Sequence, residues 1–251
     1  MKRHWKKLPI AAGVLVVLVI AGSFVYAKLI NKADPAFGEN DVIDKLNQTT
    51  TTVASSAPVA TGDTSPSSVD PSTTVAAGVD GVWNIGADSE VGYRVNESIN
   101  GFKTTANGRT NAITGSFTIA GTTVPKGDFT VDMTTFKSDE SRRDGQFNGR
   151  IMAVDQFPTA TFVLTAPIDF GAVPAEGGFV NATATGDLTL HGTTKSVSFE
   201  LKATLANGRV GVLGNIPVVF ADYGIPNPSR ATIATEDHGL LEFVLIFDKA
   251  A

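Results

Sequence analysis

Hydrophobic and polar residues alternate along most of the chain beyond residue 82. The clearest alternating runs cover residues 91–95, 129–133, 187–191 and 197–201, and clusters of turn-forming residues separate them. A period of two is typical of antiparallel strands with one apolar and one polar face. The pattern therefore predicts an all-β domain over residues 79–251.

Turn signals lie between these runs. Asn207-Gly208 is a hairpin signal, because both residues tolerate positive φ, and His191-Gly192 joins two alternating runs in the same way. Many strands of similar length predict a closed or nearly closed barrel, or a sandwich. The run 240–247 is the most apolar strand, as a closing or central strand would be.

One segment, residues 138–154, has helical rather than strand spacing. Phe147, Ile151 and Val154 lie three to four residues apart, and Ser138 or Asp139 is a candidate N-cap. Gly145 and Gly149 weaken the helix, so we expect it to be short or broken.

The first apolar segment has a different character. Residues 9–27 carry no formal charge, and about 20 apolar residues are enough for a helix to cross a bilayer. Four cations in residues 1–7 favour a cytoplasmic N-terminus. We predict a cytoplasmic stub (1–7), a single-pass transmembrane helix (8–27) and an extracytoplasmic remainder. The alternative is a signal peptide cleaved near Ala27, followed by secretion.

Residues 28–78 are predicted to be a disordered linker. Of the 31 residues from 49 to 79, fourteen are Ser or Thr, three are Pro and none is aromatic. Such a segment buries too little apolar area to offset its ordering entropy. Residues 41–46 have helical character but are too few to form a stable helix alone. A coil over residues 28–78 would hold the domain on the order of 40 Å from the membrane.

Charge and cysteine content narrow the function classes. The net charge is −5, of which residues 80–251 hold −6, and this acidic part has no basic stripe. Nucleic-acid binding is therefore not expected, because it needs clustered cations. The chain has no cysteine, which excludes disulfides, thiol catalysis and Cys-based zinc sites.

The alternation also predicts which side chains point into the barrel. They are Phe117, Ile119, Phe129, Val131, Met133, Phe162, Leu164, Leu188, Leu190, Phe199, Leu201, Phe243 and Leu245. Apolar alternation fits a packed core as well as the wall of a cavity. The pattern alone leaves both open.

Four blocks of residues carry a family resemblance. They are WNI at 83–85 with SEVGY at 89–93, RRDGQF at 142–147 with FPTATF at 157–162, GDLTLHGTTKSV at 186–197, and ADYGIP at 221–226. In this order they resemble the YceI-like family over nearly the whole region from residue 82 to 247. The two middle blocks are specific only in combination.

The resemblance implies a lipocalin-like antiparallel barrel of about eight strands with a long apolar cavity. Members of the family bind isoprenoid chains, such as polyprenyl or quinone tails, and are usually periplasmic or exported. An isoprenoid suits an apolar wall, because burying one CH₂ contributes about 0.8 kcal/mol without any hydrogen bond. The expected ligand is thus an isoprenoid or similar long-chain lipid, with no cofactor.

The chain departs from the family pattern at three places. Glu97 and Gln146 stand where members often have His, so any role of those histidines cannot be carried over. The stretch 96–114 is longer than usual and is expected to hold an extra hairpin around Asn107-Gly108.

No pattern typical of an enzyme is found. His191 and His238 would need a third ligand, such as Asp187, Glu236 or Asp237, to hold a metal, and no metal site is predicted.

Arg142, Arg143 and Asp144 are read first as structural ion pairs, and the two arginines second as contacts at the barrel mouth to a ligand headgroup. The expected function is a membrane-tethered lipid carrier or sensor. The alternatives are a non-enzymatic scaffold or adhesion domain with a filled barrel and, ranked last, an isoprenoid-modifying enzyme.

Overall fold

The computed structural model describes residues 18–25, 33–48 and 78–251. Its labelled elements lie in this order: α2 (Glu39–Asn47), β1 (Gly81–Ile85), β2 (Glu90–Ile99), β3 (Phe102–Thr110), β4 (Ile113–Ala120), β5 (Thr123–Asp132), η2 (Met133–Thr135), α3 (Ser141–Gln146), η3 (Phe147–Ile151), β6 (Thr159–Leu164), β7 (Ile168–Asp169), β8 (Phe179–Leu190), β9 (Thr193–Ala206), β10 (Arg209–Val219), η4 (Phe220–Tyr223), β11 (Ile233–Thr235) and β12 (His238–Lys249).

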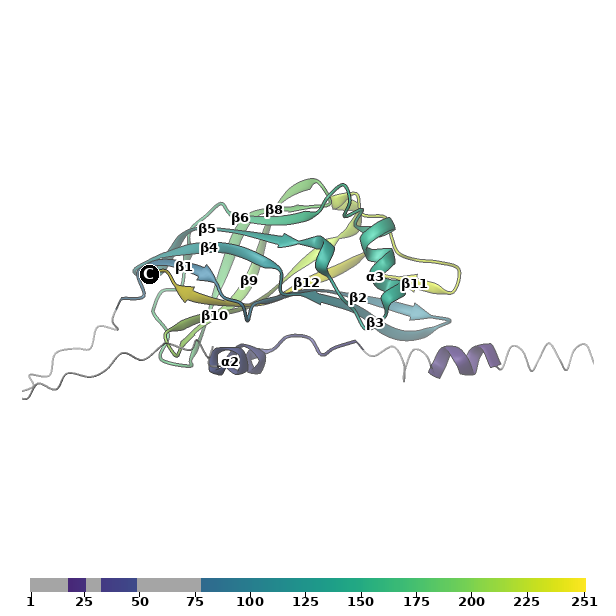
Figure 1. Cartoon of the computed structure of the whole chain (residues 1–251), viewed down its shortest axis with the longest axis horizontal. Coiled ribbons are helices and arrows are strands. Elements are labelled where there is room, and N and C mark those ends of the chain that lie inside the picture. Colours follow the sequence, from purple (N-terminus) through teal and green to yellow (C-terminus); the bar gives the residue numbers. More distant parts are fainter. Residues whose placement is uncertain (1–17, 26–32, 49–77) are drawn as a thin grey trace, which may run out of the picture.

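The strands form one closed antiparallel barrel, elongated along its axis (Figure 1). The order β1-β4-β5-β6-β8-β9-β10-β12 closes on itself, because β12 pairs with β1 through Ile85 and Phe247. The all-β, eight-stranded barrel predicted from the sequence is confirmed. Closure leaves no long unpaired strand edge in the circuit.

Two of the eight barrel strands are each built from two labelled strands. β1 and β2 both pair with β12, at opposite ends of it, and β3 and β4 continue the next strand in the same way. Ser89 lies buried in the gap between β1 and β2. Its hydroxyl donates to the Ile246 carbonyl (3.0 Å) and accepts from the Ile246 N–H (2.9 Å). The side chain thus replaces the backbone bonds that the interruption removes.

The predicted turns are found where expected, with one exception. β8 and β9 are joined at His191-Gly192 and β9 and β10 at Asn207-Gly208, each residue with positive φ. The prediction of a turn at Asn107-Gly108 is wrong, because these residues lie within β3. The extra hairpin turns at Asn100-Gly101 instead, with φ of 49° and 87°.

The helical segment is short and broken, as predicted. α3 runs for six residues and continues as one turn of π-helix. Its N-cap is Glu140, whose carboxylate accepts from the Arg142 N–H, rather than Ser138 or Asp139. Ser138 instead donates through both its N–H and its hydroxyl to Asp144.

The prediction of disorder over residues 28–78 is wrong for residues 33–48, which we call the strap. The strap lies along the outer wall of the barrel and contains α2 (Figure 1). Val42 and Leu46 of α2 are buried against Val244 and Ile246 of β12. A helix of nine residues is marginal alone, and this apolar contact supplies the missing stability. Residues 28–32 and 49–77 lie outside the described residues.

The predicted transmembrane helix falls mostly outside the described residues as well. Of residues 8–27, only 18–25 are described, and they are helical. Within the described ranges no helix has the length and apolar character needed to cross a membrane.

Candidate functional site

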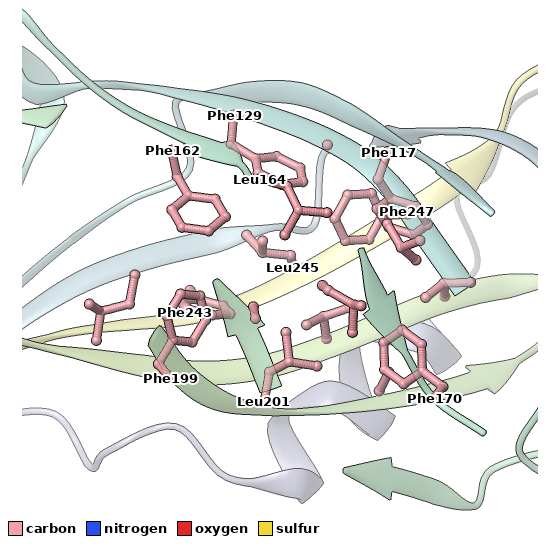
Figure 2. Close-up of a pocket in the computed structure, with 18 of the residues that line it drawn as sticks. Phe117, Phe129, Phe162, Leu164, Phe170, Phe199, Leu201, Phe243, Leu245 and Phe247 are labelled. Atoms are coloured by element: carbon pink, nitrogen blue, oxygen red, sulfur yellow. The ribbon is translucent and has the colours of Figure 1, made fainter. Parts of the chain in front are cut away.

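The barrel encloses a cavity of about 190 Å³, which we call the inner cavity. Aromatic and aliphatic side chains from opposite walls point into it (Figure 2). Among its lining residues only Thr122, Thr161 and Thr204 carry a polar side-chain atom. The wall can therefore exclude water and accept a hydrocarbon, but it offers few hydrogen-bonding groups.

All thirteen side chains predicted to point inward line this cavity. They come from β4, β5, η2, β6, β8, β9 and β12. Their role in ligand binding remains a prediction.

Sequence reasoning missed other parts of the wall. Phe247 and Ala203 continue alternations that the predicted set already contained, whereas Val212 lies on β10, from which that set took no residue. Phe170 and Val173 belong to the irregular segment before β8, where no period marks an inward side chain.

Glycines let the aromatic rings lie flat against the wall. A Cβ on Gly186 would stand 2.4 Å from the Phe162 ring, and one on Gly214 would stand 2.5 Å from the Phe243 ring. The rings of Phe162, Phe199 and Phe243 follow one another edge to face, with centroids 5.5 and 5.9 Å apart. These contacts order the aromatic side of the cavity.

A second cavity of about 430 Å³, the outer cavity, lies at the end of the barrel that carries α3 and β11. It shares Met133, Phe136, Leu190 and Leu241 with the inner cavity. These four side chains form the partition between the two spaces. Unlike the inner cavity, the outer cavity is lined by charged and amide side chains as well as apolar ones.

Tyr93 of β2 is a polar group on the barrel side of the outer cavity. Its ring stacks on Phe147 at 4.7 Å and 10°, over the position of Gly108. Burial raises the pKa of Tyr93 well above its ordinary value, although the nearby Arg143 partly opposes this. The phenol therefore stays neutral at physiological pH.

Arg142 and Arg143 line the outer cavity, not the inner one. Burial lowers the pKa of Arg143, but its ion pair with Asp139 outweighs that effect and the net shift is upward. This agrees with the structural reading of Arg143. Arg142 takes part in none of the ion pairs formed by the described residues, and its side chain is exposed.

The two positions that depart from the family pattern also meet in this cavity. Glu97 of β2 and Gln146 of α3 both line it. The Gln146 side-chain oxygen accepts a hydrogen bond from Nε of Arg230 (3.1 Å). The outer cavity thus brings together the two positions at which the sequence is expected to depart from the family pattern.

The two described histidines lie apart from any cluster of metal ligands. His191 packs on Phe157 and its Nδ1 lies 3.1 Å from the Tyr223 carbonyl. His238 is exposed beside Glu236 and Asp237. In the described ranges no three His, Asp or Glu side chains are grouped as metal ligands.

Comparison with known proteins agrees with this geometry. The model of the YceI-like domain matches residues 83–247. A UPF0312 protein of Vibrio parahaemolyticus is 29% identical over 150 residues, which cover 56% of this chain and 74% of that protein. A UPF0312 protein of Vibrio campbellii matches with the same identity and coverage.

Two solved structures share the fold. A polyisoprenoid binding domain from Saccharophagus degradans, implicated in plant cell wall breakdown, superimposes with a TM-score of 0.53 at 15% identity, covering 68% of this chain and 99% of that one. Burkholderia cenocepacia BcnA gives a TM-score of 0.51 at 19% identity, covering 64% and 98%. The matched domain, the barrel and its apolar interior together show that this chain belongs to the YceI-like family.

Proposed function

We propose that the barrel binds an isoprenoid or a similar long-chain lipid in its inner cavity. The observation that carries the proposal is a barrel interior that is hollow and lined almost entirely by carbon. Such a space favours a flexible hydrocarbon over a polar solute, because each buried CH₂ contributes about 0.8 kcal/mol. The related domain from Saccharophagus degradans, described as polyisoprenoid binding, supports the same class of ligand.

The polar end of the ligand would lie in the outer cavity. Its hydrocarbon tail would pass the partition formed by Met133, Phe136, Leu190 and Leu241. Arg142, at the rim and outside the ion pairs of the described residues, is the better headgroup contact of the two predicted arginines. Arg143 is already paired with Asp139.

The protein would act in lipid binding, transport or sensing outside the cytoplasm. Residues 8–27 would attach it to the cell membrane, with the N-terminus cytoplasmic; the alternative is secretion after cleavage near Ala27. A membrane-derived ligand suits a domain attached to its source. No catalytic role is proposed, since the inner cavity has few polar groups that could act on a lipid.

A hollow interior also separates this function from the scaffold alternative. A scaffold or adhesion domain needs only a filled barrel, whereas the described barrel contains a cavity. On the outer wall, the apolar cluster of Ala206, Val244 and Ile246 is covered by α2 and is not free to bind a partner.

Solvent extraction of the purified protein, followed by mass spectrometry, tests the proposal. We expect an isoprenoid-containing lipid in proportion to the protein, and saturable uptake of an added polyprenol by emptied protein. Repeated absence of any lipid, together with no uptake of polyprenol, would contradict it.

A further inference from the structure

The strap runs along the outer wall from beside the middle of β2 and β3 toward the end of the barrel opposite the outer cavity (Figure 1). At its start, the Asp34 N–H donates to the Asn107 side chain (3.2 Å), and Nη2 of Arg94 donates to the Asp34 carbonyl (2.8 Å). Arg109 lies over the Phe37 ring at 3.9 Å. The chain is thus fixed to the outer wall within two residues of Lys32.

α2 is fixed at the opposite end of the barrel. The Asn207 side chain, in the β9–β10 turn, donates to the Leu46 carbonyl (3.2 Å), and Lys45 pairs with Glu90 (3.1 Å). Gly78 is held at this same end, because Lys249 donates to its carbonyl. Both described flanks of residues 49–77 are therefore attached to the barrel.

This arrangement changes which residues separate the N-terminal segment from the domain. The Ser/Thr-rich residues 49–77 connect two points on the barrel itself. Only residues 26–32 lie between the described N-terminal helix and the strap. Seven residues span at most about 25 Å, and less when not fully extended.

The described N-terminal helix, residues 18–25, lies at the end of the barrel that holds the outer cavity. Five of its eight side chains are large, apolar and 40–66% exposed: Leu18, Val19, Ile20, Phe24 and Val25. The helix meets the tip of the β2–β3 hairpin, where Asn100 donates to the Ser23 hydroxyl (2.6 Å) and the Phe24 and Phe102 rings meet at 5.4 Å. An apolar patch this dense indicates an interface with another apolar phase.

We propose that the end of the barrel formed by the β2–β3 tip, β11 and α3 is a docking surface for a lipid bilayer. The exposed apolar helix enters the bilayer beside this end, and the strap holds the barrel in that orientation. The outer cavity then faces the lipid surface directly, instead of lying tens of ångströms away on a flexible tether. The inference rests on the proposed membrane attachment but not on the identity of any ligand.

Site-specific labelling of the full chain tests the orientation, because the protein has no cysteine of its own. Ala231→Cys places a fluorophore in the exposed segment just before β11, and Ala175→Cys places one at the opposite end. Each protein is reconstituted into vesicles of phosphatidylcholine and phosphatidylglycerol that contain a lipid-borne quencher. We expect quenching several-fold stronger at position 231 than at position 175.

Two insertions provide matched controls. A flexible Gly/Ser segment inserted between Lys32 and Ala33 should abolish the difference, because it frees the barrel from the helix. The same segment inserted in the middle of residues 49–77 should leave the difference unchanged.

Three outcomes would overturn the proposal. Equal quenching at both positions, or a loss of the difference only with the second insertion, would refute the orientation while leaving attachment intact. Failure of the full chain to float with vesicles would refute attachment as well. Polyprenol uptake is measured separately, and none of these three outcomes changes the uptake that we expect.

Discussion

Leu46→Ala should release the strap from the barrel without unfolding the barrel. Leu46 is 2% exposed and packs, with Val42, on the outer face of β9, β10 and β12. Its truncation leaves a cavity in a small apolar cluster that the strap alone completes. The lost free energy therefore weakens docking of the strap and leaves the pairing of the strands intact.

The expected magnitude follows from the burial of this side chain. Truncating a buried leucine to alanine costs about 2–5 kcal/mol. Even the lower figure reduces the equilibrium constant for docking by roughly 30-fold. The barrel loses only the cover of its outer face, since its hydrogen-bonded circuit does not include α2.

Amide hydrogen exchange measures the two parts separately. Protection of the α2 amides should fall by roughly 30-fold or more, while the amides that β12 shares with β10 keep most of theirs. Asp44→Ala, an exposed position on the same helix, is the control and should change stability by less than about 0.5 kcal/mol.

A second variant disrupts the contact between α2 and the barrel wall from the barrel side. A Cβ at Gly211 would stand 2.4 Å from Cγ1 of Val42, so Gly211→Val should displace α2 on its own. In the double variant with Leu46→Ala, Gly211→Val should cause little further loss of α2 protection, because both substitutions remove the same contact between α2 and the barrel. The reasoning is refuted if α2 keeps its protection in Leu46→Ala, or if β12 loses protection to the same extent.

Three further predictions concern the cavity, a buried ion pair and a histidine. Ala184→Phe should fill the inner cavity and abolish polyprenol uptake, at a cost of about 1–3 kcal/mol of stability measured by denaturant unfolding. Arg94→Ala should cost about 3 kcal/mol, because the buried Glu242 would lose two of its hydrogen bonds, of 2.8 and 3.1 Å. The hydrogen bond with Asp237 raises the pKa of His238, so its NMR titration midpoint should lie above the ordinary value and fall in Asp237→Asn.

Each has a matched control and an opposing result. Thr183→Phe adds a ring to the outward face of the same strand and should leave uptake intact; loss of uptake in both variants would argue against the cavity. Arg142→Ala, at an exposed site, should change the free energy of unfolding little. If Arg94→Ala lowers it no more than Arg142→Ala does, the ion-pair argument is contradicted.

The stabilising effect of protonated His238 should be present at low pH and disappear as pH rises through its raised pKa. If Asp237→Asn leaves the titration midpoint of His238 unchanged, the hydrogen bond with Asp237 is not the cause of the raised pKa.

The barrel and the inward side chains were predictable because antiparallel strands show which face is buried. The period-two pattern identified thirteen wall residues, and it missed Phe170 and Val173 because the segment before β8 has no period. The pattern could not show that the barrel is hollow, since packed and hollow interiors demand the same apolar faces. That distinction depends on three-dimensional spacing, including the approach of aromatic rings to Gly186 and Gly214.

The strap was missed although β12 contains a signal for it. In a strand with one solvated face, residues 243, 245 and 247 would be apolar and their neighbours polar. Here Val244 and Ile246 are apolar too, and both are 0% exposed beneath α2. The run 240–247, apolar except for Glu242, predicts a closing or central strand, and its consecutive apolar residues 243–247 also indicate that both faces of the strand are covered.

The outer cavity was only partly accessible from sequence. Arg142 and Arg143 were singled out, but their distance in the chain from Glu97 and Arg230 hid the fact that all four line one space. The hairpin turn was misplaced because Asn107-Gly108 fits a turn as well as Asn100-Gly101 does. At Gly108 the glycine serves another purpose, giving room to the Tyr93 ring.

Methyl NMR of the purified protein during addition of a polyprenol tests the central claim most directly. We expect saturable shifts of the Leu188, Leu201 and Leu245 methyl signals, which lie on the cavity wall, and unchanged signals from Val244 and Ile246 beneath the strap. Shifts confined to Val244 and Ile246, or no saturable shift of the cavity methyls in lipid-free protein, would contradict lipid binding inside the barrel.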